Sequence, residues 1–310
     1  MLRLAMISLF LFSSAKSMAA ISSSELELDQ KPIFSKHKPL ALAKKEDASA
    51  FSDVPITYNR EVQKWVKYFQ GRGRTWFKTW LERSNRHKAL IHGKLSEAGL
   101  PKDLIYLAMI ESGFSFRAVS HASAVGPWQF IAPTAKQYGL EINHWKDERR
   151  DFNKSTDAAI KYLKRLYKEF GNWYLVGAAY NTGEGRVRRQ IKRYKTNSFW
   201  VLSRKRAFVE ETKNYIPKFI AALLIAKAPH LYGFDNLNPH YEIPTDQVLV
   251  PPGTDLKEIA RHLKVTLRAM KEMNPELLHA RIPNNVSPQV IRVPKGAANK
   301  VSQFTAQMYP

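Results

Sequence analysis

The chain has 310 residues, a hydrophobic fraction of 44% and a formal net charge of +22 at pH 7. This length and composition fit one medium and one small folded domain and exclude a chain that is disordered throughout. No cysteine is present, which excludes disulfides, thiolate-bound metals, a cysteine nucleophile and a cysteine-linked lipid anchor. The basic excess favours an anionic polymer as partner, whether nucleic acid, a phospholipid surface or an acidic glycan.

Residues 1–19 have the pattern of a cleaved secretory signal. Arg3 gives a cationic start, an apolar run follows from residue 4 to 12, and small residues end at Ala19. The run is too short for a comfortable membrane span. A buried helix is the alternative, because Lys16 lies unusually close to the proposed cleavage point. We therefore expect an exported protein of the periplasm or cell envelope, and export argues against nucleic acid as the partner.

Residues 20–57 are predicted to form a linker or a loosely attached arm. Serine, lysine, glutamate and proline are mixed there without sustained periodicity. No chemistry is assigned to this segment.

Residues 58–236 are predicted to form a domain that is almost entirely α-helical. No alternating strand pattern interrupts it, and tryptophans 65, 76 and 80 fit core positions. A basic run at 186–195 is interpreted as a solvated helix face, with contact to an anionic wall polymer as the alternative. Apolar residues recur at helical spacing in segments around 62–69, 76–81, 104–108, 156–170, 175–179 and 212–226.

After Pro239 the pattern changes from helical to mixed. Apolar residues at 241–243 and 248–250 predict a first strand, residues 256–260 and 267–273 predict two helices, and residues 290–294 predict a second strand. The sequence thus predicts a compact βααβ domain over residues 241–295, with a tail at 296–310.

Glu111 stands where an apolar helical segment gives way to a turn at Gly113. A carboxyl group at such a place is desolvated enough to hold a proton near neutral pH and can still reach a substrate. Position alone does not separate this role from a structural one. No second carboxylate follows at close spacing. Glu184 is a candidate, but a glutamate at a helix start more often complements the helix dipole.

Two stretches together carry a family resemblance: residues 106–130, with Glu-Ser-Gly and Gly-Pro-Trp-Gln, and residues 178–185, with Ala-Tyr-Asn. They resemble the catalytic core of the family 23 lytic transglycosylases, which cut peptidoglycan, and among these the membrane-bound murein transglycosylase D type. The resemblance covers residues 58–234 and implies a lysozyme-like, goose-type helical domain. It departs from the family at Pro127, where leucine is usual, and at Thr182, where alanine is commoner.

The resemblance implies a role for each matching residue. Glu111 is the implied catalytic acid and then base, aided by the N-acetyl group of the muramic sugar, with a 1,6-anhydro end as product. No cofactor is implied, and the nine histidines lack the paired spacing of a zinc site. The implied substrate-binding residues are Ser112, Ser120, Gln129, Tyr180, Asn181 and Tyr215.

Two other functions stay open at this point. A hydrolytic muramidase on the same fold would activate water with Glu184 or another carboxylate. A non-catalytic peptidoglycan-binding protein would use only the basic surface and the C-terminal domain.

The predicted βααβ domain resembles a LysM module, which recognises glycans that contain N-acetylglucosamine. The resemblance rests on Asp255, on the pair Asn274-Pro275 and on the closing Val293-Pro294. We expect this domain to deliver the protein to glycan while the helical domain alone retains the chemistry. The alternative is that it merely packs on the helical domain.

Overall fold

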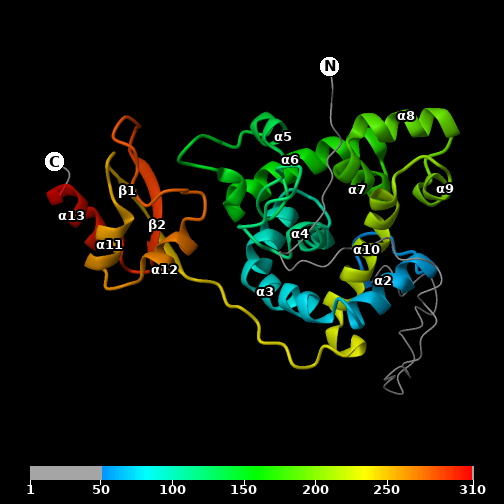
Figure 1. Ribbon diagram of the computed structural model, residues 1–310, viewed down its shortest axis with the longest axis horizontal. Coiled ribbons are helices and arrows are strands. Elements are labelled where there is room, and N and C mark those ends of the chain that lie inside the picture. Colours follow the sequence, from blue (N-terminus) through cyan, green and yellow to red (C-terminus); the bar gives the residue numbers. More distant parts are fainter. Residues whose placement is uncertain (1–50, 309–310) are drawn as a thin grey trace.

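The structure is a computed structural model, and it describes residues 51–308. The predicted signal at 1–19 and most of the predicted arm at 20–57 lie outside the described residues. The described chain forms a larger helical domain and a smaller domain with a two-stranded sheet (Figure 1). Each domain has its own cluster of buried apolar side chains.

The helical domain follows the predicted periodicity. Side-chain caps fix several helix starts, since Asn59, Asp151 and Asn172 each accept hydrogen bonds from backbone N–H groups of the first turn. Helices α5, α8 and α9 were not among the segments predicted from apolar spacing, because they are short or strongly polar. The elements are α2 (Arg60–Gln70), α3 (Arg74–Glu97), η1 (Lys102–Leu104), α4 (Ile105–Ser112), α5 (Ala132–Gln137), η2 (Glu148–Arg150), α6 (Phe152–Phe170), α7 (Trp173–Thr182), α8 (Glu184–Tyr194), α9 (Phe199–Arg204), α10 (Glu210–Lys227) and η3 (Pro229–Tyr232).

Helices α4, α7 and α10 form the centre of this domain. Every residue of α4 is buried, and α10 packs against α2, α4 and α7. Helices that are apolar on all sides need such complete enclosure. Among the predicted core tryptophans Trp80 is buried, while Trp65 and Trp76 are half-buried against the same core.

Residues 51–57 pack on the helical domain, although the sequence assigned them to the arm. The Lys227 ammonium donates to the Phe51 carbonyl oxygen, and Val54 is 3% exposed. The Tyr174 hydroxyl donates to the Pro55 carbonyl oxygen at 2.7 Å. The composition of the segment hid these contacts, because most of them use its backbone.

The smaller domain has the predicted βααβ order. It contains β1 (Thr245–Val250), α11 (Leu256–His262), α12 (Leu267–Met273), β2 (Gln289–Pro294) and α13 (Ala298–Met308). The strands pair antiparallel, from Thr245 opposite Pro294 to Val250 opposite Gln289. Residues 241–243 lie outside the strand. The predicted tail instead contains α13, whose Val301 lies in the core of the domain, so the domain extends beyond residue 295.

The smaller domain contacts the helical domain, and its delivery of the protein to glycan stays a prediction. The linker between them follows α3, where the Glu82 carbonyl oxygen accepts from the His240 N–H and Arg86 donates to the Tyr241 carbonyl oxygen. A loop between α5 and α6 reaches toward the smaller domain (Figure 1). Its Trp145 lies in the core of that domain. Within residues 51–308, no helix has both the length and the apolar character needed to cross a membrane.

Candidate active site

Glu111 lies in the last turn of α4 and is 3% exposed. The helix ends at Gly113, which has a left-handed conformation with φ of 58°. A Cβ atom at this position would lie 2.0 Å from the indole of Trp80, so only glycine fits. The chain therefore turns sharply after Glu111 and holds its carboxylate against the centre of the domain.

Tyr215 of α10 donates a hydrogen bond from its hydroxyl to Oε1 of Glu111 at 2.6 Å. Burial, and then the negative charge of Glu111, raise the pKa of the Tyr215 phenol well above its usual value. The phenol thus stays a donor at any ordinary pH. Tyr180 of α7 is also buried, and its pKa is raised by burial and by the Glu111 charge. The structure brings these three predicted residues together from three different helices.

The Tyr180 hydroxyl links this centre to the loop that carries Gln129. It donates to the Trp128 carbonyl oxygen at 2.7 Å. Gln129 itself is 2% exposed and has a left-handed backbone with φ of 48°. Its Nε2 donates to the Gly126 carbonyl oxygen at 2.9 Å, whereas its buried Oε1 has no hydrogen-bond partner among the described residues. An unpaired buried carbonyl is costly unless a ligand uses it.

The two predicted serines hold this loop through contacts within the protein. The Ser112 hydroxyl lies 2.8 Å from the Pro127 carbonyl oxygen and accepts a hydrogen bond from the Ser115 N–H. The Ser120 hydroxyl oxygen accepts from the Ala124 N–H at 3.0 Å. Substrate contact by either serine stays a prediction.

Asn181 orients a second carboxylate, Glu211, which the sequence did not single out. The Asn181 amide donates to Oε1 of Glu211 at 3.0 Å, and its carbonyl oxygen accepts from the Thr212 hydroxyl at 2.8 Å. Glu211 precedes Tyr215 by four residues on α10, which places both on one helix face. That spacing was a usable signal, because Tyr215 was already a candidate.

Lys218 is a second residue that the sequence did not single out. Its ammonium donates to the Ile110 carbonyl oxygen at 3.1 Å and lies over the rings of Trp65 and Trp80. Burial lowers the pKa of the Lys218 amine, and the charges of Glu111 and Glu211 act against that decrease. The site thus combines two carboxylates with one amine.

Glu184, the other carboxylate considered from the sequence, is held by different partners. Its carboxylate pairs with Arg165 at 3.0 Å and accepts from the Tyr162 hydroxyl at 3.2 Å. Burial acts to raise the pKa of Glu184, but its own backbone N–H and the Arg165 side chain together hold it below its usual value. The Glu184 carboxylate at the start of α8 is thus held by two side chains of α6.

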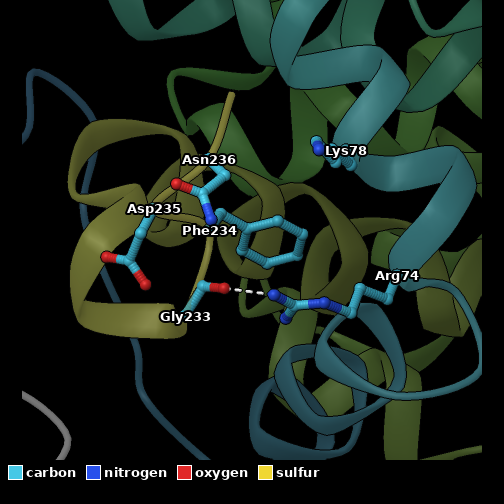
Figure 2. A pocket seen from close by; sticks show the side chains of 6 residues that line it. All are labelled: Arg74, Lys78, Gly233, Phe234, Asp235 and Asn236. Atoms are coloured by element: carbon cyan, nitrogen blue, oxygen red, sulfur yellow. Dashed lines mark hydrogen bonds between the residues drawn. The ribbon is translucent and has the colours of Figure 1, made fainter. Parts of the chain in front are cut away.

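A surface hollow of about 230 Å³ lies between the start of α3 and the chain after η3 (Figure 2). Arg74 enters it, donates to the Gly233 carbonyl oxygen and covers the Phe234 ring. None of the candidate residues lines this hollow, and its two cations have protein partners, Arg74 at the Gly233 carbonyl oxygen and Lys78 at Glu82. Among residues 51–308, no three His, Asp or Glu side chains are grouped to hold a metal ion.

Comparison with known families assigns both domains. Residues 89–203 match the model of the Transglycosylase SLT domain, and residues 244–310 match the model of the Lytic transglycosylase MltD, LysM-like domain. The SLT match includes Glu111, Gln129 and Asn181 but ends before α10. The predicted fold class is confirmed: a mainly α, lysozyme-like domain is followed by a small LysM-like βααβ domain.

Two relatives that match this chain are named as transglycosylases. The chain is 33% identical over 221 residues to membrane-bound lytic murein transglycosylase D of Escherichia coli K12, which covers 70% of this chain and 48% of that protein. It is 31% identical over 145 residues to peptidoglycan transglycosylase gp16 of Escherichia phage T7, covering 46% of this chain and 10% of that protein. The chain thus spans about half the length of the transglycosylase D relative.

Solved structures of two lytic transglycosylases are also similar. The 70 kDa soluble enzyme of Escherichia coli is 20% identical, with a TM-score of 0.40, over 55% of this chain and 30% of that one. An inactive mutant of the Pseudomonas aeruginosa enzyme Slt is 24% identical, with a TM-score of 0.39, over 50% of this chain and 25% of that one.

Proposed function

We propose that this chain, in which a transglycosylase SLT domain precedes a LysM-like domain, is a peptidoglycan lytic transglycosylase of the cell envelope. The observation that supports this proposal most directly is the buried Glu111 carboxylate, whose Oε1 accepts a hydrogen bond from the Tyr215 hydroxyl at 2.6 Å. An acid that is buried yet held in one orientation suits proton transfer to a glycosidic oxygen. The substrate is the glycan strand, and no cofactor takes part.

In the proposed reaction Glu111 acts twice on the β-1,4 bond between N-acetylmuramic acid and N-acetylglucosamine. It first gives its proton to the glycosidic oxygen, and the electron pair of the C1–O bond leaves with the departing sugar. The substrate's own N-acetyl group stabilises the positive charge at C1. The Glu111 carboxylate then takes the proton of the 6-hydroxyl, whose oxygen bonds to C1. A 1,6-anhydro end forms, water is not consumed, and Glu111 recovers its proton.

The remaining candidate residues fit substrate positioning. The Gln129 side-chain oxygen offers an acceptor for a sugar hydroxyl or amide N–H. Tyr180 connects the Gln129 loop to the acid by its bond to the Trp128 carbonyl oxygen. We propose that Ser112, Ser120 and Asn181 act mainly by fixing the surrounding loop and helices, since each is occupied by protein partners.

Hydrolysis by a muramidase is the second candidate, because Glu211 supplies another carboxylate beside the site. The negative charge of Glu211 acts to raise the pKa of both Tyr215 and Lys218. A base that activated water would give a reducing muramic end. That product is heavier than the anhydro end by one water molecule.

Mass spectrometry of digested sacculi tests the proposal. Anhydro ends from the wild type support a lytic transglycosylase, whereas reducing ends support a muramidase and overturn it. If the wild type gives no products while it still sediments with sacculi, the chain is a binding protein.

A further inference from the structure

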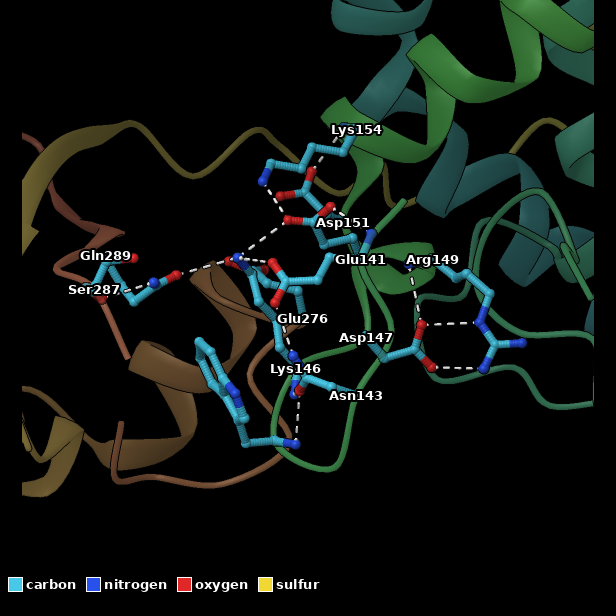
Figure 3. Close-up of polar contacts among 12 residues, drawn as sticks. Glu141, Asn143, Lys146, Asp147, Arg149, Asp151, Lys154, Glu276, Ser287 and Gln289 are labelled. Carbon is cyan, nitrogen blue, oxygen red and sulfur yellow. Dashed lines mark hydrogen bonds and ion pairs between the residues drawn. The ribbon is translucent and has the colours of Figure 1, made fainter. Parts of the chain in front are cut away.

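Residues 141–151, which we call the bridging loop, connect the two domains by more than chain continuity. The loop lies between α5 and α6 and contains Lys146, Asp147 and Arg149, all nearly buried. Figure 3 shows Lys146 directed at Gln289 of the C-terminal domain on one side and at acidic groups of the loop on the other. Charged side chains are seldom buried unless they are paired.

The C-terminal domain holds one side of the bridging loop. Trp145 is 5% exposed and belongs to the core of that domain. The Asp147 N–H donates to the Glu276 carbonyl oxygen at 2.8 Å, and the Leu278 N–H donates to the Trp145 carbonyl oxygen at 2.9 Å. The backbones are thus paired as in a short sheet.

Arg292 of β2 adds a buried ion-pair cluster. Its guanidinium contacts the carboxylate of Asp151 at 2.7 Å and also that of Glu276. Asp151 is the N-cap of α6. The C-terminal domain therefore fixes the bridging loop at its middle and at its end.

The other side of the bridging loop holds the loop of the candidate active site, residues 118–130, which we call the Gln129 loop. Asp147 accepts two hydrogen bonds from the Arg149 guanidinium, at 2.9 and 2.8 Å (Figure 3). Arg149 Nη1 in turn donates to the carbonyl oxygens of Ser123 and Phe130, each at 3.1 Å. One guanidinium thus clamps two points of the Gln129 loop.

The Gln129 loop also packs directly on the bridging loop. A Cβ atom on Gly126, whose φ is 82°, would lie 1.9 Å from the Arg149 carbonyl oxygen. Gly126 accepts the hydrogen bond that orients the Gln129 side chain. A left-handed backbone is strained for glutamine and persists only where its surroundings impose it. Here the Arg149 clamp supplies part of those surroundings, at the Ser123 and Phe130 carbonyl oxygens.

We propose that the C-terminal domain is a positioning element for the candidate active site. It fixes the bridging loop, Asp147 then holds Arg149, and Arg149 holds the Gln129 loop in the shape that presents Gln129 to the glycan. The part of this inference that concerns glycan rests on the proposed function. The coupling between the domains does not.

Hydrogen exchange of the full-length protein measures that coupling without substrate. Arg292→Gln weakens the grip of the C-terminal domain, and Lys295→Gln is its matched control, because Lys295 lies in the same domain in an exposed pair with Asp246. We expect amides of residues 118–130 to exchange about tenfold faster in Arg292→Gln and at the wild-type rate in the control. Unchanged exchange there, with faster exchange at residues 141–151, would overturn the proposal.

Arg149→Lys interrupts the same path on the far side, because lysine keeps the charge but loses the forked geometry. We expect faster exchange of residues 118–130 with no change at residues 276–278. This variant keeps the test valid even if Arg292→Gln loosens the whole C-terminal domain. If the Gln129 loop is equally protected in Arg149→Lys and in the wild type, the clamp is not what positions it.

Turnover of short soluble glycan fragments gives the functional readout. We expect Arg292→Gln and Arg149→Lys to raise KM several-fold more than they lower kcat, since the acid itself is untouched. A fall in kcat alone would contradict a positioning role. Absence of turnover in the wild type would instead refute the proposed function, and the exchange results would still decide the coupling.

Discussion

The Tyr215 hydroxyl lies 2.6 Å from Oε1 of Glu111, although the two residues are 104 positions apart in the chain. The contact is made where α10 packs against α4, a helix whose residues are all buried. Packing of two buried helices thus sets the orientation of the acid. A hydrogen bond to a charged group inside the protein contributes more than one at the surface.

Tyr215→Phe removes this donor and keeps the ring. Hydrogen bonds to charged groups contribute about 1.5–3 kcal/mol, so we expect kcat to fall by roughly 10- to 150-fold. Steady-state kinetics on soluble glycan fragments would measure the change. Tyr241→Phe is the control, because Tyr241 is 72% exposed in the linker. A kcat within twofold of the wild type would remove Tyr215 from the orientation of the acid.

Glu111→Gln keeps the shape of the side chain but has no proton to give. General acid catalysis contributes on the order of 10² to 10⁴-fold, and we expect a loss of at least that size. The rate of anhydro product release from sacculi is the measurement, with a melting curve to show that the variant is folded. Undiminished release would exclude Glu111 as the acid.

Gly113→Ala tests the tight turn after the acid. The left-handed backbone costs alanine about 1 kcal/mol, and the overlap with the Trp80 indole adds on the order of 1–3 kcal/mol. Gly171→Ala is a matched control, since Gly171 has φ of 60° but open space around its Cβ position. We expect urea unfolding to show a clearly larger loss for Gly113→Ala. Equal losses in the two variants would mean that the Trp80 contact relaxes freely.

The carboxyl group of Glu276 is expected to make the folding stability depend on pH. Burial raises the pKa of its carboxyl to about 7, against the opposing charge of Arg292. An acid whose pKa is raised by folding contributes stability below its unfolded pKa, and that contribution is lost as pH rises through the folded pKa. We therefore expect the contribution of Glu276 to the folding stability to be lost between about pH 4.5 and 7.

Glu276→Gln cannot charge and should remove this dependence. Relative to the wild type, its free energy of unfolding should increase between pH 5 and pH 8 by on the order of 1–3 kcal/mol. Denaturant unfolding at the two pH values is the measurement. A constant difference between the proteins would show that Glu276 does not titrate in this window.

Sequence reasoning found the residues whose role is marked by a local pattern. Glu111, Tyr180 and Tyr215 stand in short motifs, and the structure brings them together. Glu211 and Lys218 were missed although both share a helix face with Tyr215, because the helix was interpreted for its apolar residues only.

The bridging loop was beyond sequence reasoning for a different reason. Residues 141–151 are mostly polar, which predicts an exposed loop, and several of their partners, such as Arg292 and Glu276, lie more than a hundred positions away in the chain. Helix α13 was missed because few of its residues are buried; Val301 and Thr305 are the buried ones. The sequence of a helix with so weak an apolar stripe looks like that of an unstructured tail.

The last prediction concerns the helical domain on its own, which the sequence suggested would fold and act without the C-terminal domain. Truncation after residue 238 would expose Trp145, whose side chain is now 5% exposed in the core of the lost domain. A tryptophan buries about 150–250 Å², so its exposure creates an apolar patch and frees the bridging loop. We expect the truncated protein to self-associate and to melt at a lower temperature than the full-length chain.

Trp145→Ser in the truncated protein should restore the monomer but not the protection of residues 118–130, because the contacts with the C-terminal domain are still missing. Light scattering with hydrogen exchange would measure both effects, and a truncated wild type that stays monomeric with a fully protected Gln129 loop would show that the helical domain is self-sufficient.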